Sequence, residues 1–178
     1  MAIDILPEHT FEFKAYITYS SSIMKKWDID YKKLTMDWLN NVANNNPLNT
    51  IYPISIEMIT RIKTYLNIAQ SMNSRFSDIY VQLIKVLVYE FMFDPKIDKE
   101  KQFAAIKENI NIARGLSNGL LGYRFVTRDF YFMLYLMDYL GDKEKWLTAA
   151  RSANNELSRE LANQGRNAGD TAIFERMF

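Results

Sequence analysis

The hydrophobic pattern is clearest between residues 128 and 161, where it predicts two helices joined by a tight turn. In the first helix, one apolar face repeats every three or four residues and a second face is also largely apolar. These faces are formed by Phe130, Met133, Leu134, Met137 and Leu140, and by Phe132, Leu136 and Tyr139. A helix that is apolar on most sides is normally buried on most sides. We therefore expect this helix, capped by Thr127 or Asp129, to lie at the centre of the core.

The turn and the second helix carry their own signals. Gly141 follows the first helix, at a place where a left-handed backbone conformation favours glycine. Asp142 suits the positive end of the next helix dipole and is predicted to cap that helix. The second helix has a seam of small and apolar residues, which allows close helix packing. The seam comprises Trp146, Ala150, Ala153, Leu157 and Leu161, with Arg151, Asn155 and Arg159 on the outer face.

Further helices are predicted upstream of this hairpin. They are expected at about residues 31–43, from Ser55 to Met72, at about 77–93, and from Asp98 to Ala113. Residues 44–54 are expected to form a loop, since the residue before Pro47 avoids helical geometry. A second loop is expected around three glycines, Gly115, Gly119 and Gly122.

Residues 10–19 allow two interpretations. Apolar residues alternate with polar or amphipathic ones in TFEFKAYITY, which is typical of a strand. The alternative is a helix that begins near Pro7 and runs to Trp27. We favour the helix, because every segment downstream has a helical pattern.

Two helix starts share a short motif, Asp98-Lys-Glu-Lys and Asp142-Lys-Glu-Lys, and each follows a very apolar helix. The second half of the chain therefore resembles two helical hairpins of one design. The segment from Leu140 to Ala153 also resembles the middle of a tetratricopeptide repeat, but the DKEK motifs are 44 residues apart, against about 34 in that family. No function is inferred from this resemblance.

Composition supports an all-α protein. The chain has 178 residues, which fits a single domain, and only 6 glycines and 4 prolines, which favours helices over a turn-rich β fold. We predict a single-domain bundle of six or seven helices built from antiparallel helical hairpins. Its predicted parts are an N-terminal arm at 1–10, a helical domain at 11–165 and a C-terminal tail at 166–178.

Several functional classes receive no support from the sequence. Cysteine is absent and His9 is the single histidine, so a cysteine nucleophile, a Ser-His-Asp triad and a histidine-rich metal site have no residues to form them. We expect no catalytic activity, cofactor or metal. The net charge of +1, the lack of a signal-peptide pattern at Met1 and the polar interruptions within 79–93 favour a cytoplasmic or other intracellular protein without a membrane span.

One group of residues could contact single-stranded nucleic acid. No acidic residue lies between Arg114 and Arg128, and Arg124 is flanked by Tyr123 and Phe125. Arginine beside aromatic rings on a glycine-containing loop suits phosphate binding and base stacking. The alternative is a solvated loop whose arginines pair with nearby carboxylates.

The C-terminal tail carries four large apolar side chains after a polar tether at 165–170; they are Ile173, Phe174, Met177 and Phe178. They could pack on their own domain or on a neighbouring copy of the chain. We predict a non-catalytic assembly protein that acts through self-association, such as a coat or nucleocapsid subunit. The alternative is a monomeric adaptor, inhibitor or immunity-type protein that binds one different protein.

Overall fold

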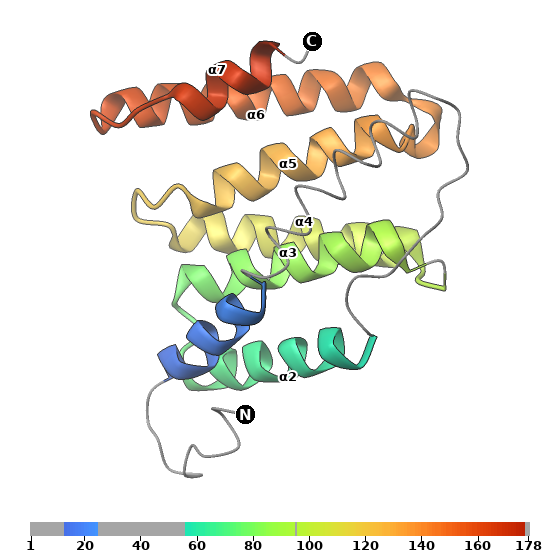
Figure 1. The fold of residues 1–178 in the computed structure, drawn as a ribbon, viewed down its shortest axis with the longest axis vertical. Coiled ribbons are helices and arrows are strands. Elements are labelled where there is room, and N and C mark those ends of the chain that lie inside the picture. The colour runs from blue at the N-terminus through green and yellow to red at the C-terminus, as the bar shows by residue number, and fades with distance from the viewer. Residues whose placement is uncertain (1–12, 25–55, 95, 177–178) are drawn as a thin grey trace. The chain divides into compact units, whose positions relative to one another are not determined.

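The computed structural model describes residues 13–24, 56–94 and 96–176, and these residues form helices joined by turns (Figure 1). The helices are α2 (Ile56–Met72), α3 (Ser77–Phe93), α4 (Lys99–Leu116), α5 (Gly122–Leu136), the short 3-10 turn η1 (Tyr139–Gly141), α6 (Lys143–Asn163) and α7 (Gly169–Arg176). Because the described residues include no strand, the all-α prediction is confirmed.

Residues 13–24 are also helical, so the helical interpretation is correct for the described part of 10–19. Other predictions fall on the rest of the chain. The N-terminal arm at 1–10, the helix at 31–43 and the loop at 44–54 lie outside the described residues.

The chain divides into two compact units, Met1–Asn109 and Ile110–Phe178, called unit 1 and unit 2 below. The domain boundaries predicted at residues 10 and 165 stay predictions.

Unit 1 is built on α2 and α3, which pack against each other. The buried side of α2 consists of Ile59, Ile62, Leu66 and Ala69, spaced three or four residues apart as expected for an amphipathic helix. The buried residues of α3 are more continuous: Ile79, Tyr80, Val81, Leu83, Ile84, Val86, Leu87, Val88, Tyr89 and Phe91. This explains its almost uninterrupted apolar sequence.

None of the helices in the described ranges is long and apolar enough to cross a membrane.

The first turn of α4, also in unit 1, begins as the sequence predicts. The Asp98 side chain accepts a hydrogen bond from the backbone N–H of Lys101 at 3.0 Å. This contact satisfies one of the N–H groups that a helix start leaves without a partner. Asp98 is therefore confirmed as a cap.

Unit 2 is built on the hairpin of α5 and α6, which pack closely along their lengths (Figure 1). Its buried residues include most of those predicted: Phe130, Phe132, Met133 and Leu134 from α5, and Trp146, Ala150, Leu157 and Leu161 from α6. The outer-face prediction for Arg151, Asn155 and Arg159 is also confirmed, since all three are exposed.

The start of α5 was predicted too late in the chain. It begins at Gly122, and its N-cap residue is Leu121, so neither Thr127 nor Asp129 caps it. Two of the three expected loop glycines are helical, because Gly115 lies in α4 and Gly122 in α5. The connection is short because Asn118 and Gly119, with φ of 42° and 83°, reverse the chain within a few residues.

The end of α5 was predicted too late as well. The helix stops at Leu136, and Asp138 and Leu140 take left-handed backbone angles, with φ of 48° and 61°. Leu140 is consequently 76% exposed and does not join the core. Gly141 is left-handed as predicted, with φ of 69°. Asp142 occupies the N-cap position of α6, but its side chain makes no capping hydrogen bond, so that part of the prediction is wrong.

Candidate functional site

Arg128 is the most unusual polar residue of unit 2. It lies within α5, and only 6% of the residue is exposed. Its Nη1 donates to Asp170 Oδ2 at 2.6 Å, and its Nε donates to Asp129 Oδ1 at 2.9 Å. Arg128 therefore lies within a helix and not in the glycine-containing loop, and its guanidinium pairs with two carboxylates of the same unit.

Two aromatic rings also contact this guanidinium. Its central carbon lies 5.5 Å from the ring centre of Phe125 and 5.0 Å from that of Phe174. Burial opposes the charged form of Arg128, but Asp129 and Asp170 outweigh this effect and raise its pKa above the ordinary value. Arg128 therefore stays charged and holds α5 to α7.

Asn154 of α6 completes this polar contact. It is only 1% exposed, and its Oδ1 accepts a hydrogen bond from Arg128 Nη1 at 3.4 Å. Its Nδ2 donates to the Thr171 backbone oxygen at 3.1 Å and to Glu175 Oε1 at 2.7 Å. Asn154 was not among the candidates drawn from the sequence, although its position four residues after Ala150 places it in the α6 seam.

The C-terminal tail forms a packed helix rather than a flexible tether followed by an apolar end. In α7, Phe174 is buried and meets Phe132 edge to face, with ring centres 5.3 Å apart. Its neighbour Ile173 is 62% exposed. The turn before α7 contains Gly165 with a φ of 65°, which reverses the chain direction. Met177 and Phe178 lie outside the described residues.

Two other members of the predicted arginine and aromatic group also meet, since the guanidinium carbon of Arg124 lies 5.1 Å from the ring centre of Tyr123. Arg124 forms an ion pair with Glu156 at 3.1 Å, and Arg114 Nη2 donates to the Asn111 side chain at 3.2 Å. Tyr123 is buried. The structure thus brings Arg128 together with Phe125 and Arg124 together with Tyr123, and both arginines also pair with carboxylates, as in the alternative interpretation.

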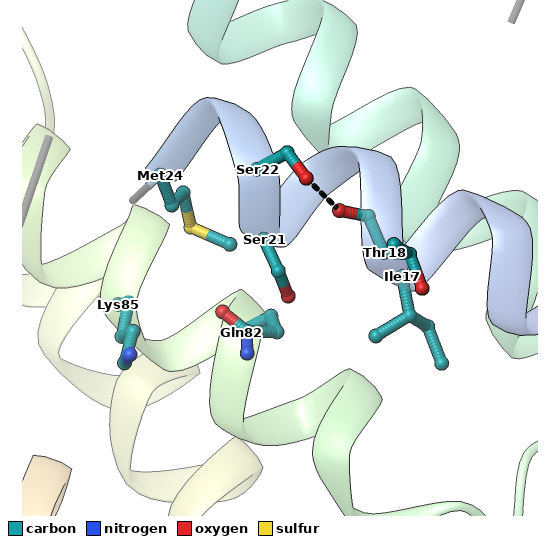
Figure 2. Close-up of a pocket in the computed structure, with 7 residues that line it drawn as sticks. All are labelled: Ile17, Thr18, Ser21, Ser22, Met24, Gln82 and Lys85. Atoms are coloured by element: carbon teal, nitrogen blue, oxygen red, sulfur yellow. Dashed lines mark hydrogen bonds between the residues drawn. The ribbon is translucent and has the colours of Figure 1, made fainter. Parts of the chain in front are cut away.

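Unit 1 contains a small pocket between helix 13–24 and α3 (Figure 2). It measures about 370 Å³ and is lined by Ile17, Thr18, Ser21, Ser22, Met24, Gln82 and Lys85. The Ser22 hydroxyl donates to the Thr18 backbone oxygen at 2.8 Å. No histidine or carboxylate lines the pocket among the described residues. We therefore assign it neither a reaction nor a ligand.

Within residues 13–24, 56–94 and 96–176, no group of three or more histidine, cysteine, aspartate or glutamate side chains could hold a metal ion. No protein-family model, curated protein or solved structure matches this chain. The buried polar contacts of Arg128 and Asn154 make the junction of α7 with the α5–α6 hairpin the candidate site.

Proposed function

We propose that this protein is a non-catalytic helical subunit that works by binding other copies of itself, with the C-terminal helix α7 as its contact element. One observation carries the proposal: α7 combines a buried side with an exposed apolar residue. Thr171 and Phe174 are buried, whereas Ile173 is 62% exposed. An exposed apolar side chain on a helix that is held in place can contribute directly to an interface.

The polar contacts of α7 support the same proposal. Arg128 and Asn154 hold the helix at Asp170, Thr171 and Glu175. A contact helix that is already ordered loses less conformational entropy on binding than a flexible tail would. Ile173 can therefore contribute its apolar area without a large ordering cost.

Contact with single-stranded nucleic acid, as in a nucleocapsid subunit, stays a prediction and is now restricted to Arg114 and Arg124. Arg128 is buried and pairs with two carboxylates. Arg124 pairs with Glu156, although its side chain keeps some exposure. A phosphate would have to displace Glu156 to bind Arg124 fully.

The test is the association state, measured by light scattering coupled to size-exclusion chromatography over a range of concentrations. We expect the parent protein to associate and Ile173→Ser to weaken association without changing the melting temperature. Leu140→Ser is a matched control, because it also removes an exposed apolar side chain from unit 2.

Two results would contradict the proposal. A parent protein that remains monomeric at every concentration would favour the monomeric adaptor. Equal loss of association in Ile173→Ser and Leu140→Ser would show that α7 has no special part in the contact.

A further inference from the structure

We infer that α7 is an exchangeable segment: in the self-associated protein, α7 of one copy occupies the α7 groove of a second copy. The α7 groove is defined here by Arg128, Phe132, Ala150 and Asn154 of the α5–α6 hairpin. The inference rests on the proposed self-association and adds to it: α7 stays ordered in an α7 groove, that of the second copy instead of its own, and Ile173 stays on its exposed side.

The first argument is that α7 carries a complete set of complementary groups. Asp170 accepts from Arg128 at 2.6 Å, and Glu175 accepts from Asn154 at 2.7 Å. Phe174 packs with Phe132 and Ala150 in one apolar cluster. Each contact joins a group on α7 to a group on the hairpin, so α7 of a second copy offers the same contacts.

The second argument concerns the connection between the hairpin and α7. Figure 1 shows α7 folded back along α6 after one short turn. In this turn, Gly165 N–H donates to the Ala162 oxygen at 3.0 Å, and Arg166 N–H donates to the Leu161 oxygen at 2.9 Å. These are the two bonds of a glycine-based helix ending. If this one ending opens, α7 can swing away while the α5–α6 contacts stay intact.

The third argument is that the α7 groove is unfavourable when empty. Without α7, Arg128 loses Asp170, Asn154 loses both of its acceptors, and the Phe132 ring loses its cover. Buried polar groups without partners and newly exposed apolar surface both destabilise the open state. An opened copy therefore closes again or accepts α7 from another copy, which is the exchange that produces swapped dimers.

Charge reversal tests this inference directly. In Arg128→Asp, the new carboxylate repels Asp170 of its own α7, and in Asp170→Arg the new guanidinium repels Arg128 of its own groove. In a mixed pair that exchanges α7, one groove regains opposite charges with the polarity reversed, and the other groove has the original Arg128–Asp170 pair. We expect roughly tenfold more dimer in the equimolar mixture than in either variant alone.

A second pair of variants covers the case in which a charge reversal prevents folding, which circular dichroism would reveal. Gly165→Ala places a side chain at a φ of 65°, where alanine is strained although no atom blocks its Cβ. The closed turn becomes less favourable, so we expect a shift from monomer to dimer at equal concentration. Gly115→Ala is the matched control, because its Cβ also meets no atom and Gly115 lies in a helix without positive φ.

The results separate the inference from the proposed function. A parent protein that associates, together with no mixed dimer from folded charge-reversal variants and no shift in Gly165→Ala, would overturn exchange and leave self-association standing. A parent protein and a Gly165→Ala variant that both remain monomeric would overturn both. Mixed dimers, or a shift in Gly165→Ala that Gly115→Ala lacks, support exchange.

Discussion

The helix starts at Asp98 and Asp142 share the sequence Asp-Lys-Glu-Lys but differ in structure. The Asp98 carboxylate accepts a hydrogen bond from the Lys101 backbone, whereas the Asp142 carboxylate makes no capping bond. The difference follows from the preceding residues. Before Asp142, Leu140 and Gly141 are both left-handed, and Asp142 itself has φ of −123° and ψ of 57°. The motif sets where the helix begins, and the preceding turn decides what the aspartate side chain does.

The fourth residue after each aspartate makes a similar hydrogen bond, although one residue is a glutamine and the other a tryptophan. Gln102 is buried and donates its side-chain N–H to the Leu87 backbone oxygen at 3.0 Å. Trp146 is buried and donates its indole N–H to the Tyr139 backbone oxygen at 2.7 Å. Each side chain ties the start of its helix to the segment before it. The two helix starts therefore make similar contacts through different residue types.

Of the substitutions at the two helix starts, Trp146→Ala should lower the free energy of unfolding most. It removes a buried aromatic side chain and the donor to Tyr139, so we expect the free energy of unfolding to fall by about 3–5 kcal/mol in urea denaturation. Trp146→Phe keeps a ring and should lose less. Lys143→Ala changes an exposed residue of the same helix and serves as the control. Equal denaturation midpoints for Trp146→Ala and Lys143→Ala would show that the indole contact contributes nothing.

Gln102→Ala should have a smaller effect at the other helix start. The Leu87 oxygen and the Glu90 carboxylate each lose a hydrogen bond, although Lys63 still pairs with Glu90 at 3.0 Å. We expect the free energy of unfolding to fall by about 1–3 kcal/mol, measured by the same denaturation. Glu108→Ala, at an exposed position of α4, is the control. If the two substitutions have equal effects, Gln102 does not fasten α4.

The two aspartates should respond differently to the same substitution. Asp98→Ala removes a capping bond and should lower the free energy of unfolding by about 1 kcal/mol. Asp142→Ala should change it by less than about 0.5 kcal/mol, because its side chain has only an exposed ion pair with Lys145 at 3.7 Å. Paired thermal melts of the two variants check this order. A larger loss in Asp142→Ala would mean that the carboxylate caps α6 in solution.

Much of the helical architecture could be predicted from the sequence. Apolar spacing places α3 at its observed bounds, and glycine chemistry identifies the left-handed residue Gly141. These features depend on neighbouring residues, which the sequence displays directly. The C-terminal end of α5 was less predictable, because Asp138 and Leu140 adopt left-handed angles that are uncommon outside glycine, above all for a leucine.

The candidate site was harder to predict than the fold. An arginine beside aromatic residues has the same sequence pattern whether it faces a phosphate or an internal carboxylate. Arg128 pairs with an internal carboxylate, that of Asp170, which lies 42 residues away in a segment predicted to be a polar tether. Phe174 likewise contacts Arg128 and Phe132 of α5, which are far away in the sequence. Residue spacing within one helix contains no information about such a pairing.

The smallest predicted effect is that Lys99 and Tyr131 change the free energy of unfolding in opposite directions at alkaline pH. Burial lowers the pKa of Lys99, at the start of α4, below its ordinary 10.5, although Asp94 partly offsets this. Burial raises the pKa of Tyr131, in α5, above its ordinary 10.0, although Arg114 opposes this. A buried group favours its neutral form, so the charged lysine and the deprotonated tyrosine each destabilise the folded state.

These shifts fix the sign of each pH dependence. Folded Lys99 holds its proton less tightly than the unfolded chain does, so its contribution to stability rises with pH between its lowered pKa and 10.5. Folded Tyr131 holds its proton more tightly, so its contribution is constant below pH 10.0 and falls as the pH rises from there to its raised pKa. Urea unfolding from about pH 8 to about pH 11 should be compared among the parent, Lys99→Met and Tyr131→Phe. The parent should gain stability relative to Lys99→Met as pH 10.5 is approached and lose it relative to Tyr131→Phe above pH 10.0. Differences that stay constant across this range would show that neither side chain is buried as the structure describes.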